Sequence, residues 1–163
     1  MTTMIIGIGC VSMLALLGQG TLANNEGTEL TTAMNLAGNV REAMAGLSYS
    51  DPNVPSHWGP ELSGPGPVED NVTKYNDYDD FDGKKFNPPI NANRLSLGSN
   101  YATWEQQVAV QTVNPNDLNT AISHLTLPPN LRPTCRCTVT VLHNGKVIYA
   151  QSWIAAYADP SAP

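Results

Sequence analysis

The chain has 163 residues, enough for one small domain together with one extended segment. Only 13% of its residues are charged, and the formal net charge is −6. An acidic chain with eight Lys and Arg residues lacks the positive surface that attracts nucleic acid or anionic lipid, so we predict no nucleic-acid partner.

The first 47 residues predict one long helix with two different halves. No charged side chain precedes Glu26, and residues 4–17 are almost continuously apolar. Residues 26–47 place apolar side chains three or four positions apart, which is the spacing of one helix face. We therefore distinguish an apolar half, residues 1–25, from an amphipathic half, residues 26–47. A rod of this length cannot be covered by the rest of the chain, so its apolar half is expected to lie in a membrane or against other copies of the chain.

The apolar half does not match the usual sequence pattern of a signal peptide, a lipoprotein signal or a conventional membrane anchor. A secretory signal peptide has Lys or Arg before its apolar core, whereas the first basic residue here is Arg41. A lipoprotein signal is suggested by Gly9-Cys10, but it too needs basic residues first. A conventional membrane anchor needs about 20 apolar residues, and this run is shorter and interrupted by glycine. The small residues would allow helices to approach closely, as they do in lipid; they are Gly7, Gly9, Ala15, Gly18 and Gly20.

Residues 48–100 form a region rich in Pro, Gly and Asp that we expect to be a loop region on the surface, anchored by Trp58. Its most acidic part contains Asp77, Asp79, Asp80 and Asp82, which are weak candidates for a calcium site. The register of an EF-hand loop fails, because counting back from Gly83 puts Tyr78 at its first position. We therefore expect these side chains to bind turn amides, and we predict no metal and no cofactor. Asn71 begins a glycosylation sequon, which leaves its modification open.

Residues 101–163 predict an antiparallel sheet. Residues 101–113 alternate Trp104, Gln106, Val108 and Val110 with more polar residues, as a strand with one buried face does. Residues 134–157 read as a hairpin about Asn144-Gly145. A two-residue turn in regular register would pair Arg136 with Trp153 on the outer face, where Tyr149 would also lie, and would allow a cation–π contact between Arg136 and Trp153. It would also put one apolar face on the helix at Met34, Ala37, Val40 and Met44; that face comprises Cys135, Cys137, Val139, Val141, Ile148, Ala150 and Ile154.

Two further features belong to this region. Residues 114–133 look like an inserted loop, in which Pro115 and Asp117 could open a short helix through Leu125. Cys135 and Cys137 point the same way on one strand, with Cα atoms about 6.6 Å apart, near the upper limit for a bridge. Two buried thiols are the expected state, and a disulfide between them is the alternative.

A resemblance to a known protein family supports this arrangement of a long helix followed by a small sheet. The stretch IIGIGCVSMLALLGQGTLANN, followed by an Ala-rich amphipathic half, resembles the N-terminal helix of type IV pilins and type II secretion pseudopilins. The segment YDDFDG, the strand that follows it and the final hairpin are similar to minor pilins of the mannose-sensitive haemagglutinin type. In those families a glutamate stands at mature position five, where this chain has Ile5. Either the chain starts downstream of the mature terminus, or this subunit lacks the glutamate.

We expect an α+β fold, a long N-terminal helix packed against a small antiparallel sheet. The resemblance implies a structural subunit of a type IV pilus-like filament at the cell surface, with a methylated N-terminus. Its partners would be copies of itself, the inner-membrane assembly machinery and a prepilin peptidase. The side chains expected in the filament core are Met1, Met4, Ile5, Ile6, Ile8, Val11, Met13, Leu14, Leu16, Leu17 and Leu22.

Two alternatives stay open. One is a pseudopilin of a type II secretion system. The other is a membrane-anchored binding or adhesin module that uses Trp58, Tyr101 and Trp104 as a ligand platform. We do not expect an enzyme, because His57, His124 and His143 lie in unrelated segments without a nucleophile motif, a phosphate loop or zinc spacing.

Overall fold

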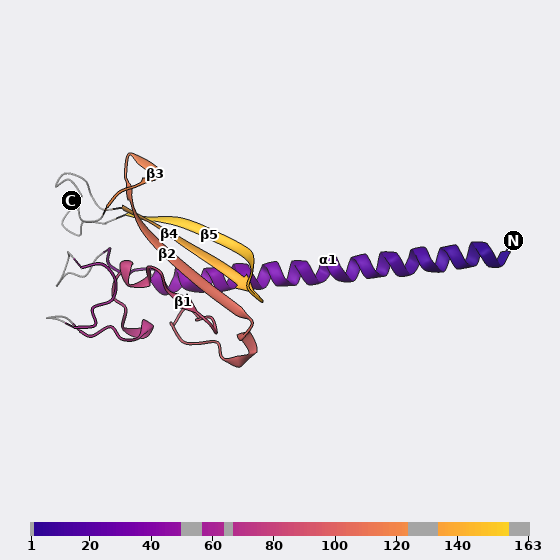
Figure 1. Cartoon of the computed structure of the whole chain (residues 1–163), viewed down its shortest axis with the longest axis horizontal. Coiled ribbons are helices and arrows are strands. Elements are labelled where there is room, and N and C mark those ends of the chain that lie inside the picture. The colour runs from indigo at the N-terminus through magenta and orange to yellow at the C-terminus, as the bar shows by residue number, and fades with distance from the viewer. Residues whose placement is uncertain (1, 50–56, 64–66, 124–133, 157–163) are drawn as a thin grey trace.

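A computed structural model of the chain describes residues 2–49, 57–63, 67–123 and 134–156 (Figure 1). For residues 2–12 and Ala15 it describes the backbone but not the side chain. The fold is α+β, as predicted, with one N-terminal helix packed against a small antiparallel sheet.

Helix α1 (Thr2–Met44) is continuous over 43 residues, so both predicted halves form a single helix. At 1.5 Å per residue its length is about 65 Å. It ends where Gly46 adopts a left-handed conformation with φ 83°, which glycine allows at little cost. The first half projects beyond the sheet, and only the second half is covered by it (Figure 1).

The sheet consists of antiparallel strands in the order β1-β2-β4-β5, with β3 paired to the end of β2. The strands are β1 (Lys85–Phe86), β2 (Trp104–Asn114), β3 (Asp117–Ala121), β4 (Thr134–His143) and β5 (Lys146–Ala156). Along β2 the buried side chains are those predicted from alternation, Trp104, Gln106, Val108 and Val110. This face and the matching face of β4 form the core with the helix.

The helix face in the core differs slightly from the predicted one. Ala37, Val40 and Met44 are buried as expected, whereas Met34 is 48% exposed and Ala33 takes its place. Ala33, Ala37 and Val40 follow the spacing of three and four residues that one helix face requires. Two alanines on this face allow the sheet to approach the helix closely, and Met34 falls just beside the contact.

The hairpin forms at Asn144-Gly145, but its register contains a bulge that the sequence did not predict. Both turn residues have positive φ (50° and 76°), as a two-residue hairpin turn requires. Val147 pairs with Leu142 and Tyr149 pairs with Val141, so Ile148 is an extra residue on β5. A shift of one residue moves every later side chain to the other face.

The bulge corrects three predictions. Tyr149 and Trp153 pack against the core although we expected them on the outer face, while Ala150 and Ile154 are exposed. Ile148, at the bulge, keeps its predicted contact with the core. Arg136 pairs with Ile154 rather than Trp153, and its guanidinium donates to Gln111 Oε1 at 2.8 Å instead of lying on the indole. The expected cation–π contact is therefore absent.

The predicted short helix from Pro115 is also wrong, because residues 117–121 form strand β3. Asn114 and Asp117 pair across Pro115-Asn116, and the Asn116 amide donates to Asn114 Oδ1 at 2.9 Å. Pro and Asn at the two central positions favour a tight turn, so the chain reverses and continues β2 as a hairpin. The expected end of that helix at Leu125 lies outside the described residues.

The loop region between helix and sheet packs beside the C-terminal part of α1 (Figure 1). Its described residues include the 3₁₀ turns η1 (Val72–Lys74) and η2 (Asp79–Phe81), and a third such turn, η3 (Ser99–Tyr101), leads into β2. Phe81 is completely buried, and Tyr75 and Ile90 join the same core. Trp58 is half-buried against this core, and its indole donates to Asp82 Oδ2 at 3.0 Å. Trp58 thus anchors the region as predicted.

Candidate functional site

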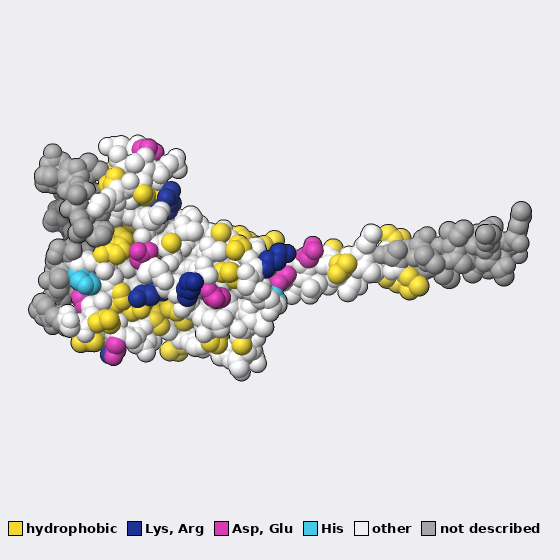
Figure 2. Space-filling model, in the orientation of Figure 1, with side chains coloured by type: hydrophobic (Ala, Val, Ile, Leu, Met, Phe, Trp, Pro, Cys, Tyr) yellow, Lys and Arg dark blue, Asp and Glu magenta, His cyan; other side chains and the backbone are white. Residues whose placement is uncertain are grey.

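The projecting half of α1 exposes an apolar surface. Between 66% and 69% of the area of each large hydrophobic side chain described here is accessible to solvent; these side chains are Met13, Leu14, Leu16, Leu17 and Leu22. Figure 2 shows hydrophobic side chains along the described part of the projecting rod. The side chains of the other expected core residues, Met1, Met4, Ile5, Ile6, Ile8 and Val11, lie outside the described residues. Contiguous exposed apolar surface of this kind marks an interaction site.

Among the described residues, no helix has both the length and the apolarity needed to cross a membrane.

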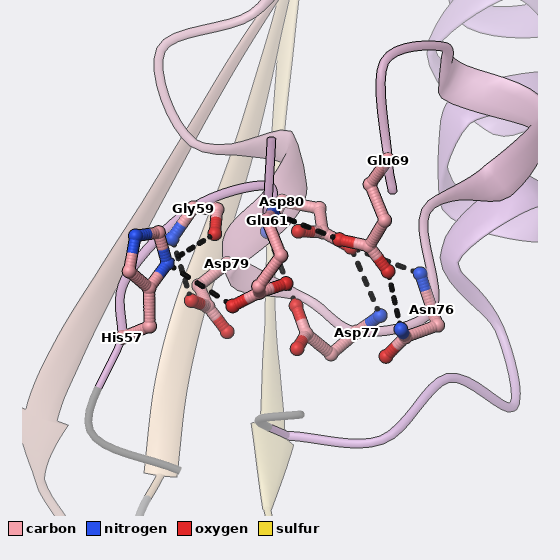
Figure 3. A network of polar contacts seen from close by, with 8 residues as sticks. All are labelled: His57, Gly59, Glu61, Glu69, Asn76, Asp77, Asp79 and Asp80. Atoms are coloured by element: carbon pink, nitrogen blue, oxygen red, sulfur yellow. Dashed lines mark hydrogen bonds and ion pairs between the residues drawn. The ribbon is translucent and has the colours of Figure 1, made fainter. Parts of the chain in front are cut away.

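A second feature lies inside the loop region, where carboxyl groups gather in the interior (Figure 3). Five of them are buried, on residues Glu61, Glu69, Asp77, Asp79 and Asp80. The two Glu flank a stretch of loop whose backbone closes through the Glu69 amide, which donates to the Glu61 carbonyl at 2.9 Å. The three Asp lie in or just before turn η2, and Asp79 of this turn contacts the backbone of Gly59, two residues before Glu61.

Backbone amides hold most of these carboxyl groups in place. Asp80 Oδ2 accepts from the Asn76 amide at 2.9 Å, and Asp77 Oδ1 accepts from the Asp80 amide at 3.2 Å. Asp79 Oδ2 accepts from the Gly59 amide at 2.8 Å, which joins η2 to the segment around Trp58. The predicted role of these Asp side chains in binding turn amides is therefore confirmed.

Burial leaves part of the cluster without partners. Among the described residues, Glu61 Oε2, Asp79 Oδ1 and Asp80 Oδ1 are buried and have no hydrogen-bond partner. Burial raises the pKa of Glu69 to about 8, and the neighbouring carboxyl groups of Glu61 and Asp80 add to the effect. Burial, followed by the charge of Asp79, raises the pKa of Asp77 to about 9. The cluster thus disfavours its own full ionisation at neutral pH.

These pKa shifts predict that, in buffer containing EDTA, the chain resists urea better at pH 5.5 than at pH 7.5. Asp and Glu of the unfolded chain titrate near pH 4, whereas folded Glu69 and Asp77 keep their protons up to about pH 8 and 9. The folded state therefore binds more protons than the unfolded state between these limits. The stability that results is complete below about pH 4 and is lost as the pH rises through 8 to 9. We expect a difference in unfolding free energy of roughly 1–3 kcal/mol between the two pH values.

The variant Asp77→Asn should reduce this pH dependence, because the Asn side chain does not titrate. Its amide oxygen can still accept from the Asp80 backbone amide, so we expect the turn to be kept. Asp70→Asn is the matched control, since Asp70 is exposed and pairs with Lys74 at 2.7 Å outside the cluster. Equal pH dependence in wild type and Asp77→Asn would contradict the raised pKa.

Of the predicted metal candidates, the structure brings Asp77, Asp79 and Asp80 together. Asp82 points elsewhere and accepts from Trp58 and from the Val110 amide. Sequence reasoning missed Glu61 and Glu69. Their separation from the Asp-rich stretch follows no motif, and only the folded loop brings them to Asp80.

The two strand cysteines are buried free thiols, with their Sγ atoms 3.8 Å apart. They share one face of β4, as the strand register predicted. Hydrogen bonding to Cys135 and burial both raise the pKa of the Cys137 thiol. Both thiols are buried, so neither is an exposed nucleophile. The side chain of Cys10 lies outside the described residues.

The histidines and the proposed aromatic platform have structural contacts. His57 Nδ1 lies 3.0 Å from Glu61 Oε1, and His143 pairs with Glu29 of α1 and stacks on Trp104. Trp104 is buried, and Tyr101 is half-buried against the core, so these rings do not offer a shared open face. His124 lies outside the described residues, whereas Asn71 is exposed.

Comparison of the chain with family models, with curated proteins and with solved structures gave no match.

Proposed function

We propose that this chain is a structural subunit of a helical, pilus-like filament and that its partners are other copies of the same chain. The observation that supports this proposal is the rod of exposed apolar side chains on α1, which projects beyond the domain that covers its other half. Fully burying one Leu or Met side chain contributes roughly 1.5–3 kcal/mol, so five such residues favour association by about 10 kcal/mol before the entropic cost.

A second copy suits this surface better than a folded partner of another kind. Parallel helices bury their apolar side chains around the full circumference of a rod when several copies pack side by side. The exposed large side chains occupy two adjacent pairs of positions, 13–14 and 16–17, and the single position 22, which point in different directions around the helix. One flat partner would cover only some of these directions.

The helix glycines support the same proposal. A Cβ added to Gly18 or Gly20 would meet no atom within 4 Å, so nothing in the single chain requires glycine there. Glycine inside a helix costs about 1 kcal/mol relative to alanine. Close approach of another helix gives these positions a use that the isolated subunit does not have.

The resemblance to type IV pilins and pseudopilins supplies the finer proposals. They are processing by a prepilin peptidase, insertion by inner-membrane machinery and assembly at the cell surface. The charge-free stretch before Glu26 agrees with a helix that passes from lipid into a filament core. A pseudopilin of a secretion system would share this mode of assembly.

The test replaces Leu17 with lysine and examines sheared cell-surface material by electron microscopy and intact-mass analysis. In a filament core the charge would be buried without a partner, so we expect fibres to be lost. Leu62→Lys is the matched control, because Leu62 lies in the loop region and is exposed to the same extent, 66%, as Leu17. Fibres containing this chain should persist in the control.

Wild-type fibre yield from Leu17→Lys would overturn the proposal, as would finding the wild-type chain only as monomers. Short assemblies confined to the cell envelope in wild type would favour the pseudopilin. Circular dichroism of both variants checks that the sheet domain is unchanged.

A further inference from the structure

We propose that Glu61, Glu69 and Asp80 form a binding site for one Ca²⁺ ion, which fastens the segment that carries Glu61 and Glu69 to turn η2. The proposal does not depend on filament assembly, because all three residues lie in the covered domain, away from the projecting half of α1. It rests on the convergence of the three carboxyl groups and on oxygens among them that have no partner.

The three carboxyl groups lie close enough together to share one ion. Each of the three residues offers one carboxylate oxygen, and these oxygens lie within 4.8 Å of one another. Figure 3 shows the three side chains directed into the same space, with Glu61 and Glu69 approaching from the loop and Asp80 from η2. Two oxygens on one Ca²⁺ at 2.3–2.6 Å are at most about 5 Å apart, so a single ion spans the set after small movements.

The second observation is the lack of hydrogen-bond partners. Glu61 and Asp80 are at least nine-tenths buried, at 5% and 0% exposure, and each has one oxygen without a partner among the described residues. A buried carboxylate oxygen without a donor is costly, and the usual remedies are a proton, a cationic side chain or a metal ion.

The nearby positive side chains are already engaged. His57 contacts Glu61 but also lies 2.8 Å from the Gly59 carbonyl, and it is half exposed. Arg94, whose charge is close enough to interact with Asp80, donates from Nε to the Ala43 carbonyl at 3.1 Å and from Nη1 to the Tyr75 carbonyl. Among the described residues, the five buried carboxyl groups outnumber the cationic side chains beside them, and a divalent cation would offset the charge of those that ionise.

The donor set selects the kind of ion. All three donors are oxygens, whereas Zn²⁺ sites favour Cys and His, so a hard cation fits best. Mg²⁺ requires bonds near 2.1 Å and strict octahedral geometry, which limits two ligands to about 4.2 Å apart. Ca²⁺ accepts the wider and less regular arrangement. Bound there, it would link residue 61 to residue 80 and hold the proline-rich loop against the domain.

The experiment measures thermal unfolding of the full chain in a mild non-ionic detergent at pH 7.5, in EGTA and in 5 mM CaCl₂. We expect Ca²⁺ to raise the midpoint by about 5 °C or more, and 5 mM MgCl₂ to raise it by less than half as much. Calorimetric titration of the EGTA-treated chain should give one Ca²⁺ per chain.

Glu69→Gln is the decisive variant. It replaces a carboxyl group that must ionise to bind Ca²⁺ with an amide of nearly the same shape, so we expect it to fold and, in EGTA, to unfold at the same temperature as wild type or higher. Its response to Ca²⁺ should be lost, and Glu61→Gln should behave alike. Asp70→Asn changes the charge of the adjacent exposed residue and should keep the full response.

No calcium-dependent shift in wild type would overturn the proposal and indicate that the carboxyl groups share protons instead. A full response in Glu69→Gln would also overturn it, because Ca²⁺ would then act elsewhere. Because the readout is unfolding of single chains, its outcome is independent of whether filaments form.

Discussion

Replacing Phe81 with alanine should lower the free energy of unfolding by about 3–5 kcal/mol, the largest loss we expect from a single truncation in this domain. Phe81 is completely buried, and its ring meets the edges of Tyr75 and Phe86 at centroid distances of 5.1 and 6.3 Å. The Arg94 guanidinium lies 5.8 Å from its centre. Alanine would leave a cavity that these rigid neighbours cannot fill. Urea unfolding followed by tryptophan fluorescence measures the loss, because Trp58, Trp104 and Trp153 all pack on this core.

Phe86→Ala is the matched control, since Phe86 is the only other phenylalanine in the chain and belongs to the same aromatic group. Its side chain is half-buried on the short strand β1, so its loss should be less than half as large. Equal losses in the two variants would show that the core is not centred on Phe81.

Replacing Gln106 with leucine should cost about 2–4 kcal/mol even though leucine is apolar and similar in size. Gln106 is a completely buried polar side chain near the start of β2. Its Oε1 accepts from the Ile90 amide at 2.8 Å, and its Nε2 donates to the carbonyls of Leu36 in α1 and of Ile90. This one amide joins the sheet, the helix and the loop region. Leucine would leave the Ile90 amide and carbonyl buried without these partners.

The neighbouring residue gives the control for this prediction. Gln107 lies on the opposite face of the same strand and is partly exposed, and its side-chain amide donates to Glu105 Oε1 at 2.7 Å. Gln107→Leu should change the free energy of unfolding, measured by urea denaturation, by less than about 0.5 kcal/mol. If Gln106→Leu were as stable as wild type, apolar packing alone would hold the helix on the sheet.

The sequence pattern predicts the burial of Gln106 but neither the reason for that burial nor the burial of Phe81. The alternation along β2 placed Gln106 on the buried face but gave no reason for a polar residue there. That reason is the Ile90 backbone, 16 residues earlier, which needs an internal partner. Phe81 stands among aspartates in a stretch predicted to be surface loop. Its burial depends on η2 turning it inward, a contact between distant segments that periodicity does not encode.

The sequence by itself determined the features that depend on neighbours along the chain. They are the continuous helix with an uncharged first half, the Asn144-Gly145 turn and the strand at 104–114, each set by local spacing or by backbone preference. Tertiary structure alone decided the bulge at Ile148, which reversed the faces of β5, and the strand that follows Pro115-Asn116. It also brought Glu61 and Glu69 to Asp80. These features depend on pairing and burial between residues that are far apart in the sequence. One extra residue in a strand, or one loop that closes on itself, changes which side chains meet but leaves the local sequence pattern unchanged.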